Sequence, residues 1–371
     1  MAALKKLSKP IPPKDIPITE IRTPAIMFDR NEHFTIGDDN PQREYRMQKD
    51  LTPDEKFKGI TTKWGQLKLL LSELQFFTLY WNPIDVPNPI VVYVGAAIGT
   101  HIIGLVEMFP TFTWHLYDKN VSTDPRGKQL YDFNPILREE KYKDKIIIFD
   151  RYFGSDDVIE YQKMNNRIFF LSDIRNIKHD TSLSTEESAK KMENLVWADM
   201  EMQQRWVSDL NPVKALLKFR LPYSNPYTLS LGKTRKYLSG VVYLQQYTSA
   251  TSTELRLVPY DNITQQNWDF TKVESIIFYH NSRIREDTRF LNPITSQDKP
   301  LSLELGISQN YDSTAMIVIG MEYLKKFGVS VVTEEMMIEF INYLTFKANN
   351  GKSTLLGKFN RISGQVEEDE D

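Results

Sequence analysis

The sequence predicts an α/β fold in which helices cover both faces of a doubly wound, mostly parallel sheet with an antiparallel edge strand. Short, continuous apolar runs recur along the chain, and several of them end at a glycine or an aspartate. Between these runs lie stretches whose apolar residues follow helical spacing. Continuous apolar runs are typical of strands buried on both faces of a parallel sheet, and their alternation with helices is typical of a doubly wound fold.

The expected elements begin with a helix over residues 66–81, where leucines and Phe77 recur near helical spacing. An apolar strand follows at residues 90–94, and a second helix begins near residue 100. The next three expected strands are residues 111–117, 145–149 and 167–171.

A capping box, Ser184-Thr-Glu-Glu187, predicts the start of a long helix that ends near Leu210. In this motif the serine hydroxyl and the glutamate carboxylate each accept a backbone N–H that the first helical turn leaves without a partner. The remaining expected elements are a strand at 213–219, a pair of strands at 241–246 and 254–259 that forms an antiparallel hairpin at the sheet edge, and a helix at 334–346.

Composition divides the chain into three segments. Residues 1–60 are rich in proline and charge, and we expect an extended N-terminal arm. Residues 61–350 carry the α/β pattern together with a C-terminal helical flank. Residues 351–371 end in a run of glutamate and aspartate, which predicts an acidic, disordered tail.

The composition also excludes several classes of protein. The 371 residues include no cysteine, which excludes disulfides and thiolate sites and fits a reducing compartment. The five histidines lack metal-ligand spacing, so no metal is expected. Because we find neither a membrane-spanning pattern nor an apolar leader, we expect a cytoplasmic protein without a membrane partner. The net charge of −3 restricts any RNA contact to a local basic patch.

A glycine loop, Gly95-Ala-Ala-Ile-Gly99, ends the first expected strand. Gly95 allows a sharp turn, and Gly99 lets a ligand approach the next helix. Asp118 ends the second strand, where a carboxylate can accept the ribose hydroxyls of a nucleoside. Ala97 replaces the second glycine of the dinucleotide fingerprint, which favours S-adenosylmethionine and makes a nicotinamide dehydrogenase the least favoured class. An ordinary βα turn remains the alternative.

The run Gly351-Lys-Ser-Thr354 suggests a phosphate-binding P-loop at first sight. That motif requires a glycine five positions earlier, where this chain has Phe346. We therefore interpret the run as a surface turn after a helix.

Four charged residues occupy positions that a doubly wound sheet brings towards one crevice. Lys68 lies on the helix before the first strand, and Asp173 follows the fourth strand. Lys218 is near the end of the fifth strand, and Glu254 begins or precedes the last. Each of them alone is more simply explained as a solvated surface charge. Together they predict a catalytic site, because ligands of such sheets bind beyond the carboxyl ends of the strands.

Five short motifs, in the same order along the chain, together indicate one family far more specifically than any single motif does. They are GQLKLLLSEL from Gly65, VVYVGAAIGTHI from Val91, LSDIR ending at Arg175, LKFRLPY ending at Tyr223, and TELRL from Thr253. Over roughly residues 63–280 they resemble the poxvirus-type family of cap-specific mRNA 2′-O-methyltransferases, which also serve as the poly(A) polymerase regulatory (small) subunit. The resemblance implies a Rossmann-like, S-adenosylmethionine-dependent methyltransferase of a large DNA virus.

The resemblance implies that Lys68, Asp173, Lys218 and Glu254 form a catalytic tetrad. A ribose 2′-hydroxyl is a very weak acid, so the enzyme must align the reacting atoms and remove or steer the proton. Lys218 is expected to be the general base, since burial and a neighbouring cation lower the pKa of a lysine. Lys68 and Asp173 would tune and orient it, and Glu254 would position it or the ribose.

The same resemblance implies residues that hold the cofactor and the methylated guanine of the cap. Ile98 stands where the family has proline. The family grips the cap between aromatic rings, here expected to be Tyr45 and Tyr223, with Glu274 as one carboxylate and Asn225 in place of the other. The expected cofactor-binding residues are Gln66, Tyr93, Gly95, Gly99, His101, Asp118 and Arg175.

Basic side chains suited to RNA phosphates are scattered over the second half of the chain, and a solvated loop is an equal alternative for the densest cluster, residues 233–236. The expected RNA-binding residues are Lys178, Lys214, Arg220, Lys233, Arg235 and Lys236.

The leading hypothesis is methylation of the first transcribed ribose of mRNA, which converts cap 0 to cap 1. Two alternatives stay open: a non-catalytic, RNA-binding subunit that makes a viral poly(A) polymerase processive, and a 2′-O-methyltransferase acting on another RNA, as bacterial ribosomal enzymes do. The expected partners are capped mRNA and a viral poly(A) polymerase catalytic subunit, in the host cytoplasm or the virion.

Overall fold

The computed structural model describes most of the chain between residues 64 and 351. The expected N-terminal arm is described only at residues 21–22 and 41–46, and residues 352–371 of the expected tail lie outside the described part, as do Lys178 and Asn225. The described residues are 21–22, 41–46, 64–119, 132–164, 167–176, 184–224, 232–249, 251–285, 288–303 and 305–351.

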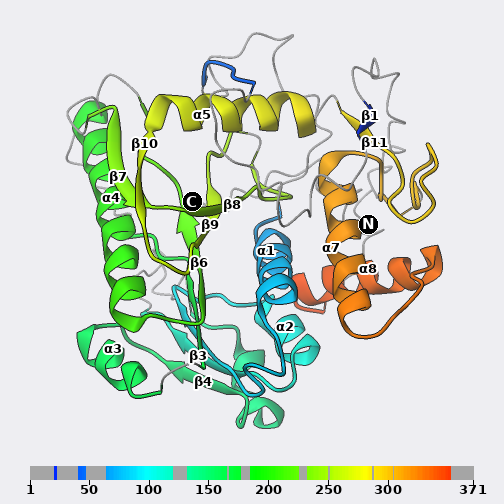
Figure 1. The fold of residues 1–371 in the computed structure, drawn as a ribbon, viewed down its shortest axis with the longest axis horizontal. Helices are drawn as coiled ribbons and strands as arrows, with labels where there is room; N and C mark the ends of the chain where they lie inside the picture. Colours follow the sequence, from blue (N-terminus) through cyan, green and yellow to red (C-terminus); the bar gives the residue numbers. More distant parts are fainter. Residues whose placement is uncertain are drawn as a thin grey trace, which may run out of the picture.

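Within these residues, seven strands form one sheet at the centre of the molecule (Figure 1). In spatial order they are β4 (Ile146–Phe149), β3 (Thr113–Tyr117), β2 (Ile90–Val94), β5 (Ile168–Ser172), β6 (Lys214–Phe219), β9 (Leu255–Pro259) and β8 (Gly240–Tyr243).

The topology confirms the doubly wound, mostly parallel sheet. The chain runs outward from β2 through β3 to β4 and then crosses back to β5 on the other side of β2, so the topological switch lies between β2 and β5. β9 pairs antiparallel with β6 and with β8. The antiparallel strand, β9, therefore lies one position inside the edge, and β8 is the edge strand. The chain forms β8 at the edge first and then turns back, so that β9 inserts between β8 and β6.

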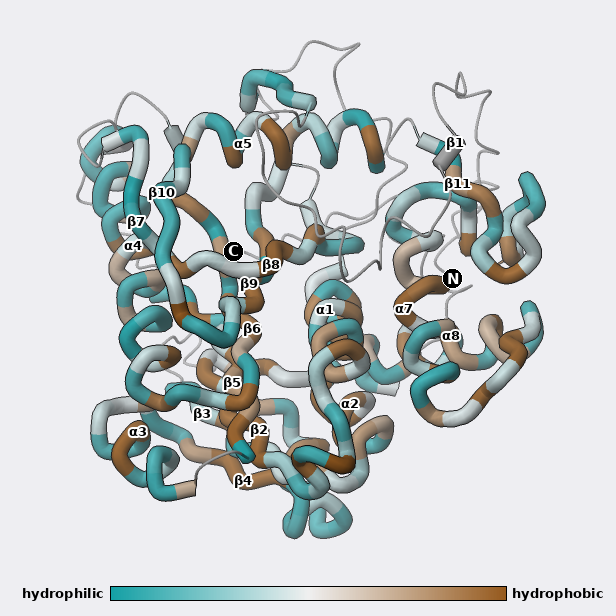
Figure 2. Tube along the Cα trace, viewed as in Figure 1, coloured by the Kyte–Doolittle hydropathy of each residue, from teal (hydrophilic) through white to brown (hydrophobic). Residues whose placement is uncertain are grey.

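Helices cover both faces of this sheet (Figure 1). On one face α1 (Gly65–Tyr80), α2 (Ile102–Met108), α7 (Tyr311–Lys326) and α8 (Glu334–Ala348) pack together. On the other face lie α3 (Ser155–Gln162) and α4 (Thr185–Leu210), and α5 (Phe270–Tyr279) crosses the end of the sheet at the top of Figure 1. Figure 2 shows the apolar residues concentrated in the central strands, whereas α4 alternates between polar and apolar residues.

Local sequence signals explain most of these elements. All five residues of β5 are buried, as its apolar run predicted. The capping box of α4 is confirmed: Ser184 Oγ accepts the backbone N–H of Glu187 at 3.3 Å, and Glu187 Oε2 accepts that of Ser184 at 3.0 Å. No sequence signal predicted α7, whose residues 311–320 are all buried. A helix buried on all sides shows no amphipathic period.

Shorter elements complete the described fold. β7 (Thr234–Leu238) pairs antiparallel with β10 (Gln265–Asp269), and β1 (Ile21–Arg22) pairs parallel with β11 (Arg289–Phe290). The remaining turns are the 3₁₀ helices η3 (Pro135–Arg138) and η4 (Glu140–Tyr142) and the π-helix η6 (His280–Ile284), which continues α5. In the described part of the chain, no helix has the length and apolarity needed to cross a membrane.

Candidate active site

The four residues of the expected tetrad meet at the carboxyl edge of the sheet. Lys68 projects from α1, Asp173 follows β5, Lys218 lies in β6 and Glu254 precedes β9. Glu254 joins the two lysines: its Oε1 lies 2.7 Å from Lys68 Nζ, and its Oε2 lies 3.3 Å from Lys218 Nζ. Asp173 Oδ1 lies 3.3 Å from Lys218 Nζ. The fold thus places Lys218 between two carboxylates.

Two arginines complete this cluster. Arg256 Nη1 lies 2.6 Å from Asp173 Oδ1, and its Nη2 lies 3.3 Å from Glu254 Oε1. Arg175, expected to bind the cofactor, has Nη2 3.0 Å from Glu254 Oε2. Arg256 was not among the residues predicted from the sequence. It reaches the cluster because it is the cross-strand partner of Lys218 in the β6–β9 ladder, and directly paired residues project from the same face.

Burial and neighbouring charges shift the pKa values of the cluster. Burial is the largest influence on Lys218 and lowers its pKa; Asp173 and Glu254 oppose this effect, and Arg175 and Arg256 add to it. Burial alone would raise the pKa of both carboxyls, but the surrounding cations outweigh it, so both pKa values are lowered. The cluster therefore favours ionised carboxylates beside a lysine that loses its proton more readily than usual.

The glycine loop after β2 adopts a backbone that favours glycine. Gly95 has φ +79° and Gly99 has φ +73°, both in the left-handed region. A Cβ on Gly95 would lie 2.8 Å from the carbonyl carbon of Asp173 and 2.9 Å from the backbone nitrogen of Ile174. The loop after β2 is therefore packed directly against the segment that carries Asp173.

Asp118 closes this loop from the neighbouring strand. Its Oδ2 accepts the backbone N–H of Ala97 at 3.0 Å, which ties the end of β3 to the middle of the glycine loop. Burial raises the pKa of Asp118, and the hydrogen bond from Ala97 partly offsets this effect. A half-buried carboxylate at this position suits a ligand that donates hydroxyl hydrogen bonds.

Three of the other expected cofactor residues join a buried network centred on Glu73. Gln66 Oε1 accepts the backbone N–H of His101 at 3.3 Å and lies 2.9 Å from His101 Nδ1. His101 Nε2 lies 3.1 Å from Glu73 Oε2, and Tyr93 Oη donates to Glu73 Oε1 at 2.7 Å. Tyr93 and His101 are only 2% and 1% exposed, so in this network they brace the base of the loop. The apolar pattern of α1 gave no signal for Glu73.

The two tyrosines expected to grip the cap also come together. The ring centroids of Tyr45 and Tyr223 lie 5.1 Å apart, with 29° between the ring planes. Tyr45 belongs to the described segment 41–46, which Arg43 joins to α5 by donating its backbone N–H to Ser275 O at 3.0 Å. The hydroxyl of Tyr45 donates to Thr251 O at 3.2 Å. This part of the arm thus lies over the carboxyl side of the sheet.

Glu274 lies beside this ring pair and is 6% exposed. Its Oε2 accepts the backbone N–H of Ser224 at 2.9 Å and the Ser224 hydroxyl at 2.6 Å. Burial raises the pKa of Glu274, and the two hydrogen bonds from Ser224 oppose this. A cavity of about 10 Å³, which fits no more than about one water molecule, lies among Leu221, Pro222, Tyr223, Thr253, Phe270, Val273 and Glu274.

The expected RNA-binding residues do not gather in one place. Lys214 begins β6 at the opposite edge from Lys218 and pairs with Asp261. Arg220 is 7% exposed and forms an ion pair with Glu193, 2.9 Å from Nη1 to Oε2, so its guanidinium is buried and paired. Exposed Lys233 and Lys236 and half-buried Arg235 lie on or beside β7.

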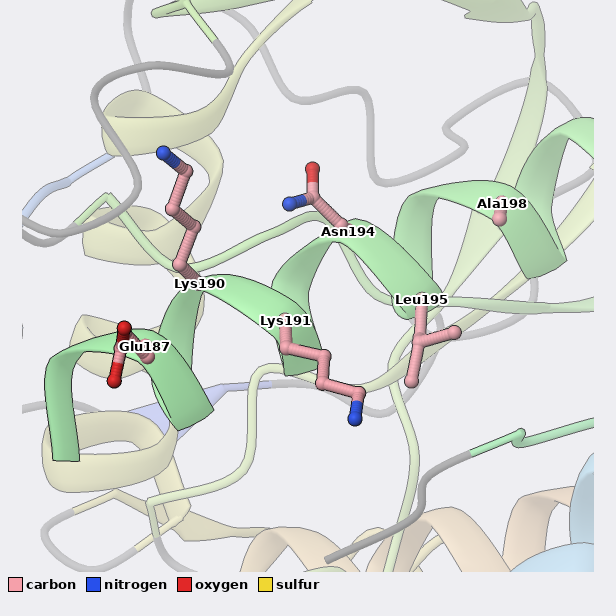
Figure 3. A pocket seen from close by; sticks show the side chains of 6 residues that line it. All are labelled: Glu187, Lys190, Lys191, Asn194, Leu195 and Ala198. Carbon is pink, nitrogen blue, oxygen red and sulfur yellow. The ribbon is translucent and has the colours of Figure 1, made fainter. Parts of the chain in front are cut away.

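A larger hollow, of about 500 Å³, lies on the outer surface of α4 (Figure 3). The side chains of Lys190 and Lys191 point in opposite directions there. Polar groups that diverge do not make a specific binding site, so this hollow contributes nothing to the candidate active site. It is lined by Glu187, Lys190, Lys191, Asn194, Leu195 and Ala198.

Curated relatives come from poxviruses. A Fowlpox virus (strain NVSL) protein named cap-specific mRNA (nucleoside-2′-O-)-methyltransferase is 26% identical over 277 residues, which are 72% of this chain and 78% of that protein. A Myxoma virus (strain Lausanne) protein of the same name is 28% identical over 233 residues, or 60% of this chain and 61% of that protein.

A family model describes a larger part of the chain than either relative. The model of the poly A polymerase regulatory subunit matches residues 30–342, which include every residue of the charged cluster and the glycine loop after β2. A match over most of the chain establishes the family, and this protein is therefore a member of the poly A polymerase regulatory subunit family.

Proposed function

We propose that this protein is an S-adenosylmethionine-dependent, cap-specific mRNA (nucleoside-2′-O-)-methyltransferase. The observation that carries the proposal is Lys218 held by Asp173 and Glu254, with the segment of Asp173 packed against the glycine loop. The Fowlpox and Myxoma virus relatives carry the name of this activity, which supports the same substrate class for this chain.

The residues around the glycine loop fit S-adenosylmethionine. Asp118 would accept hydrogen bonds from the ribose hydroxyls, and the backbone from Gly95 to Gly99 would hold the adenosine beside it. The contact between Gly95 and the segment of Asp173 supports this arrangement, because the loop that would hold the cofactor touches a catalytic residue. When bound, the cofactor supplies a methyl group already activated on a sulfonium.

Lys218 would act as the general base on the ribose 2′-hydroxyl. A neutral Nζ accepts the hydroxyl proton as the oxygen gains the methyl group, and the lowered pKa of Lys218 makes the neutral form accessible. Asp173 and Glu254 would hold Nζ in place and stabilise the ammonium that forms. Arg256 would keep Asp173 ionised and oriented.

Tyr45 and Tyr223 would take the guanine of the cap between their rings. Two stacking contacts of about 3.5 Å each require roughly 7 Å between the rings, so the 5.1 Å separation must widen on binding. Glu274 would then read the edge of the base once Ser224 releases its carboxylate.

Asp118→Ala is expected to act mainly on cofactor binding, by raising the dissociation constant of S-adenosylmethionine. Two hydrogen bonds to a charged group would be lost, which corresponds to roughly tenfold or more in the dissociation constant. Isothermal titration of the folded variant with S-adenosylmethionine measures this effect. An unchanged dissociation constant would remove Asp118 from the cofactor site.

The substrate is tested by methyl transfer from labelled S-adenosylmethionine to three short RNAs of one sequence. One carries an N7-methylguanosine cap, one an unmethylated cap and one a 5′-triphosphate. We expect transfer only to the methylated cap, at the first transcribed ribose. Transfer to all three RNAs would favour a 2′-O-methyltransferase with another substrate, and transfer to none despite cofactor binding would refute the proposed activity.

A second function follows from the family model, whose description names a poly A polymerase regulatory subunit. We propose that the chain also binds a viral poly(A) polymerase catalytic subunit. This role does not need Lys218, so the Lys218→Ala variant should retain the partner in a pull-down from co-expressed proteins. Failure of the wild-type chain to retain any polymerase subunit would leave methyl transfer as its sole proposed function.

A further inference from the structure

A buried ion pair holds Tyr223 from the side of α4. Glu193 is 3% exposed and Arg220 is 7% exposed. Arg220 Nη1 donates to Glu193 Oε2 at 2.9 Å, and Nη2 donates to Oε1 at 3.1 Å, which makes the pair bidentate. Glu193 Oε2 also accepts the backbone N–H of Tyr223 at 3.0 Å. One carboxylate therefore orients both the arginine and the tyrosine.

The same arginine lies over the aromatic ring. The guanidinium carbon of Arg220 is 4.5 Å from the Tyr223 ring centroid, within the range of a cation–π contact. Burial disfavours the charge on Arg220, but the attraction and hydrogen bonds of Glu193 outweigh it, so the pKa of Arg220 is raised and its charge is permanent. A base stacked on Tyr223 would thus share the ring with a fixed cation.

This arrangement affects how strongly the Tyr223 ring binds a base that carries a positive charge. N7-methylation makes guanine cationic, and a second cation on or near the same ring opposes its binding. A carboxylate bound to both guanidinium nitrogens cancels that repulsion. A neutral guanine would be affected much less by either charge.

We infer that Glu193 is a specificity-determining positioning residue, which orients Tyr223 and cancels the charge of Arg220 so that the ring accepts a positively charged base. The inference rests on the proposed cap-binding function, and it gives Arg220 a role other than contact with RNA phosphates. Glu193 acts through Arg220 and Tyr223 and need not touch the ligand.

The test is a titration of the full chain with 7-methylguanosine triphosphate and, separately, with GTP. Binding is monitored by intrinsic tyrosine and tryptophan fluorescence. Wild type is expected to prefer the methylated nucleotide. Glu193→Gln should reduce the ratio of the two affinities by roughly tenfold, with the loss confined to the methylated nucleotide. The matched control is Glu186→Gln, which removes an exposed carboxylate from the first turn of the same helix.

A double variant keeps the test decisive if the lone buried arginine of Glu193→Gln prevents folding. Glu193→Gln with Arg220→Gln removes both charges, and its affinity ratio should return to the wild-type value or exceed it. An unchanged ratio in folded Glu193→Gln, or an equal loss for both nucleotides, would overturn the inference, as would a reduced ratio in the double variant. A wild-type chain that binds neither nucleotide would instead refute the proposed cap-binding function.

Discussion

Replacement of Lys218 by alanine is expected to reduce methyl transfer by roughly 10²–10⁴-fold, the usual contribution of a general base. Cofactor affinity should change little, because Lys218 contacts Asp173 and Glu254 rather than the glycine loop. Single-turnover methyl transfer to N7-methylguanosine-capped RNA and titration with S-adenosylmethionine separate the two effects. A loss of cofactor affinity as large as the loss of rate would contradict the assignment.

The matched control is Lys163→Ala, which removes an exposed lysine at the end of α3 and should leave the rate unchanged. The wild-type rate should also depend on pH. The ammonium form of Lys218 cannot accept a proton, so the rate should rise as the pH rises through its lowered pKa and reach a plateau below the pKa of an ordinary lysine. A rate that is flat with pH, with chemistry limiting, would remove Lys218 as the base.

Gly95→Ala is expected to cause a large loss of both cofactor binding and methyl transfer. The new methyl group would lie 2.8 Å from the carbonyl carbon of Asp173, and a backbone atom cannot rotate away as a side chain can. The φ of +79° adds roughly 1–2 kcal/mol of strain for an L-residue. The loop or the Asp173 segment must therefore shift, and we expect the dissociation constant of S-adenosylmethionine to rise by at least about tenfold.

Gly154→Ala is the matched control for this substitution. A Cβ at Gly154 meets nothing within 4 Å, and its φ of −140° is open to any residue. Denaturant unfolding should show a larger loss of stability in Gly95→Ala than in Gly154→Ala, where only the preference of the N-cap of α3 for glycine is lost. Wild-type cofactor affinity in the Gly95→Ala variant would show that the tight contact between the two loops does not shape the cofactor site.

Several parts of the fold could be predicted because their signals are local. The bounds of β2 are those of its apolar run, and the capping box marks the start of α4. Asp173 and Lys218 were placed correctly at the carboxyl edge because parallel strands bring their ends to one side of a sheet. Fold class and the neighbourhood of the charged residues therefore follow from short-range patterns together with the rules of parallel sheets.

Other features depend on contacts between distant residues. Arg256 joins the cluster only through the register of β6 and β9, and the sequence motif around it does not reveal that register. The ion pair of Arg220 likewise depends on α4, which places Glu193 against it. The stacking of Tyr45 on Tyr223 also requires residues 41–46 to lie against α5.

The sequence by itself determined the seven strands of the central sheet, the cap of α4 and the chemical types gathered at the sheet edge, since burial and capping act over a few neighbouring residues. Only the tertiary structure decided which charge pairs with which. In the described part of the chain, packing brings Glu193 within hydrogen-bond distance of the buried Arg220 and places Arg220 over the ring of Tyr223, although Glu193 lies 27 residues before Arg220 in the sequence.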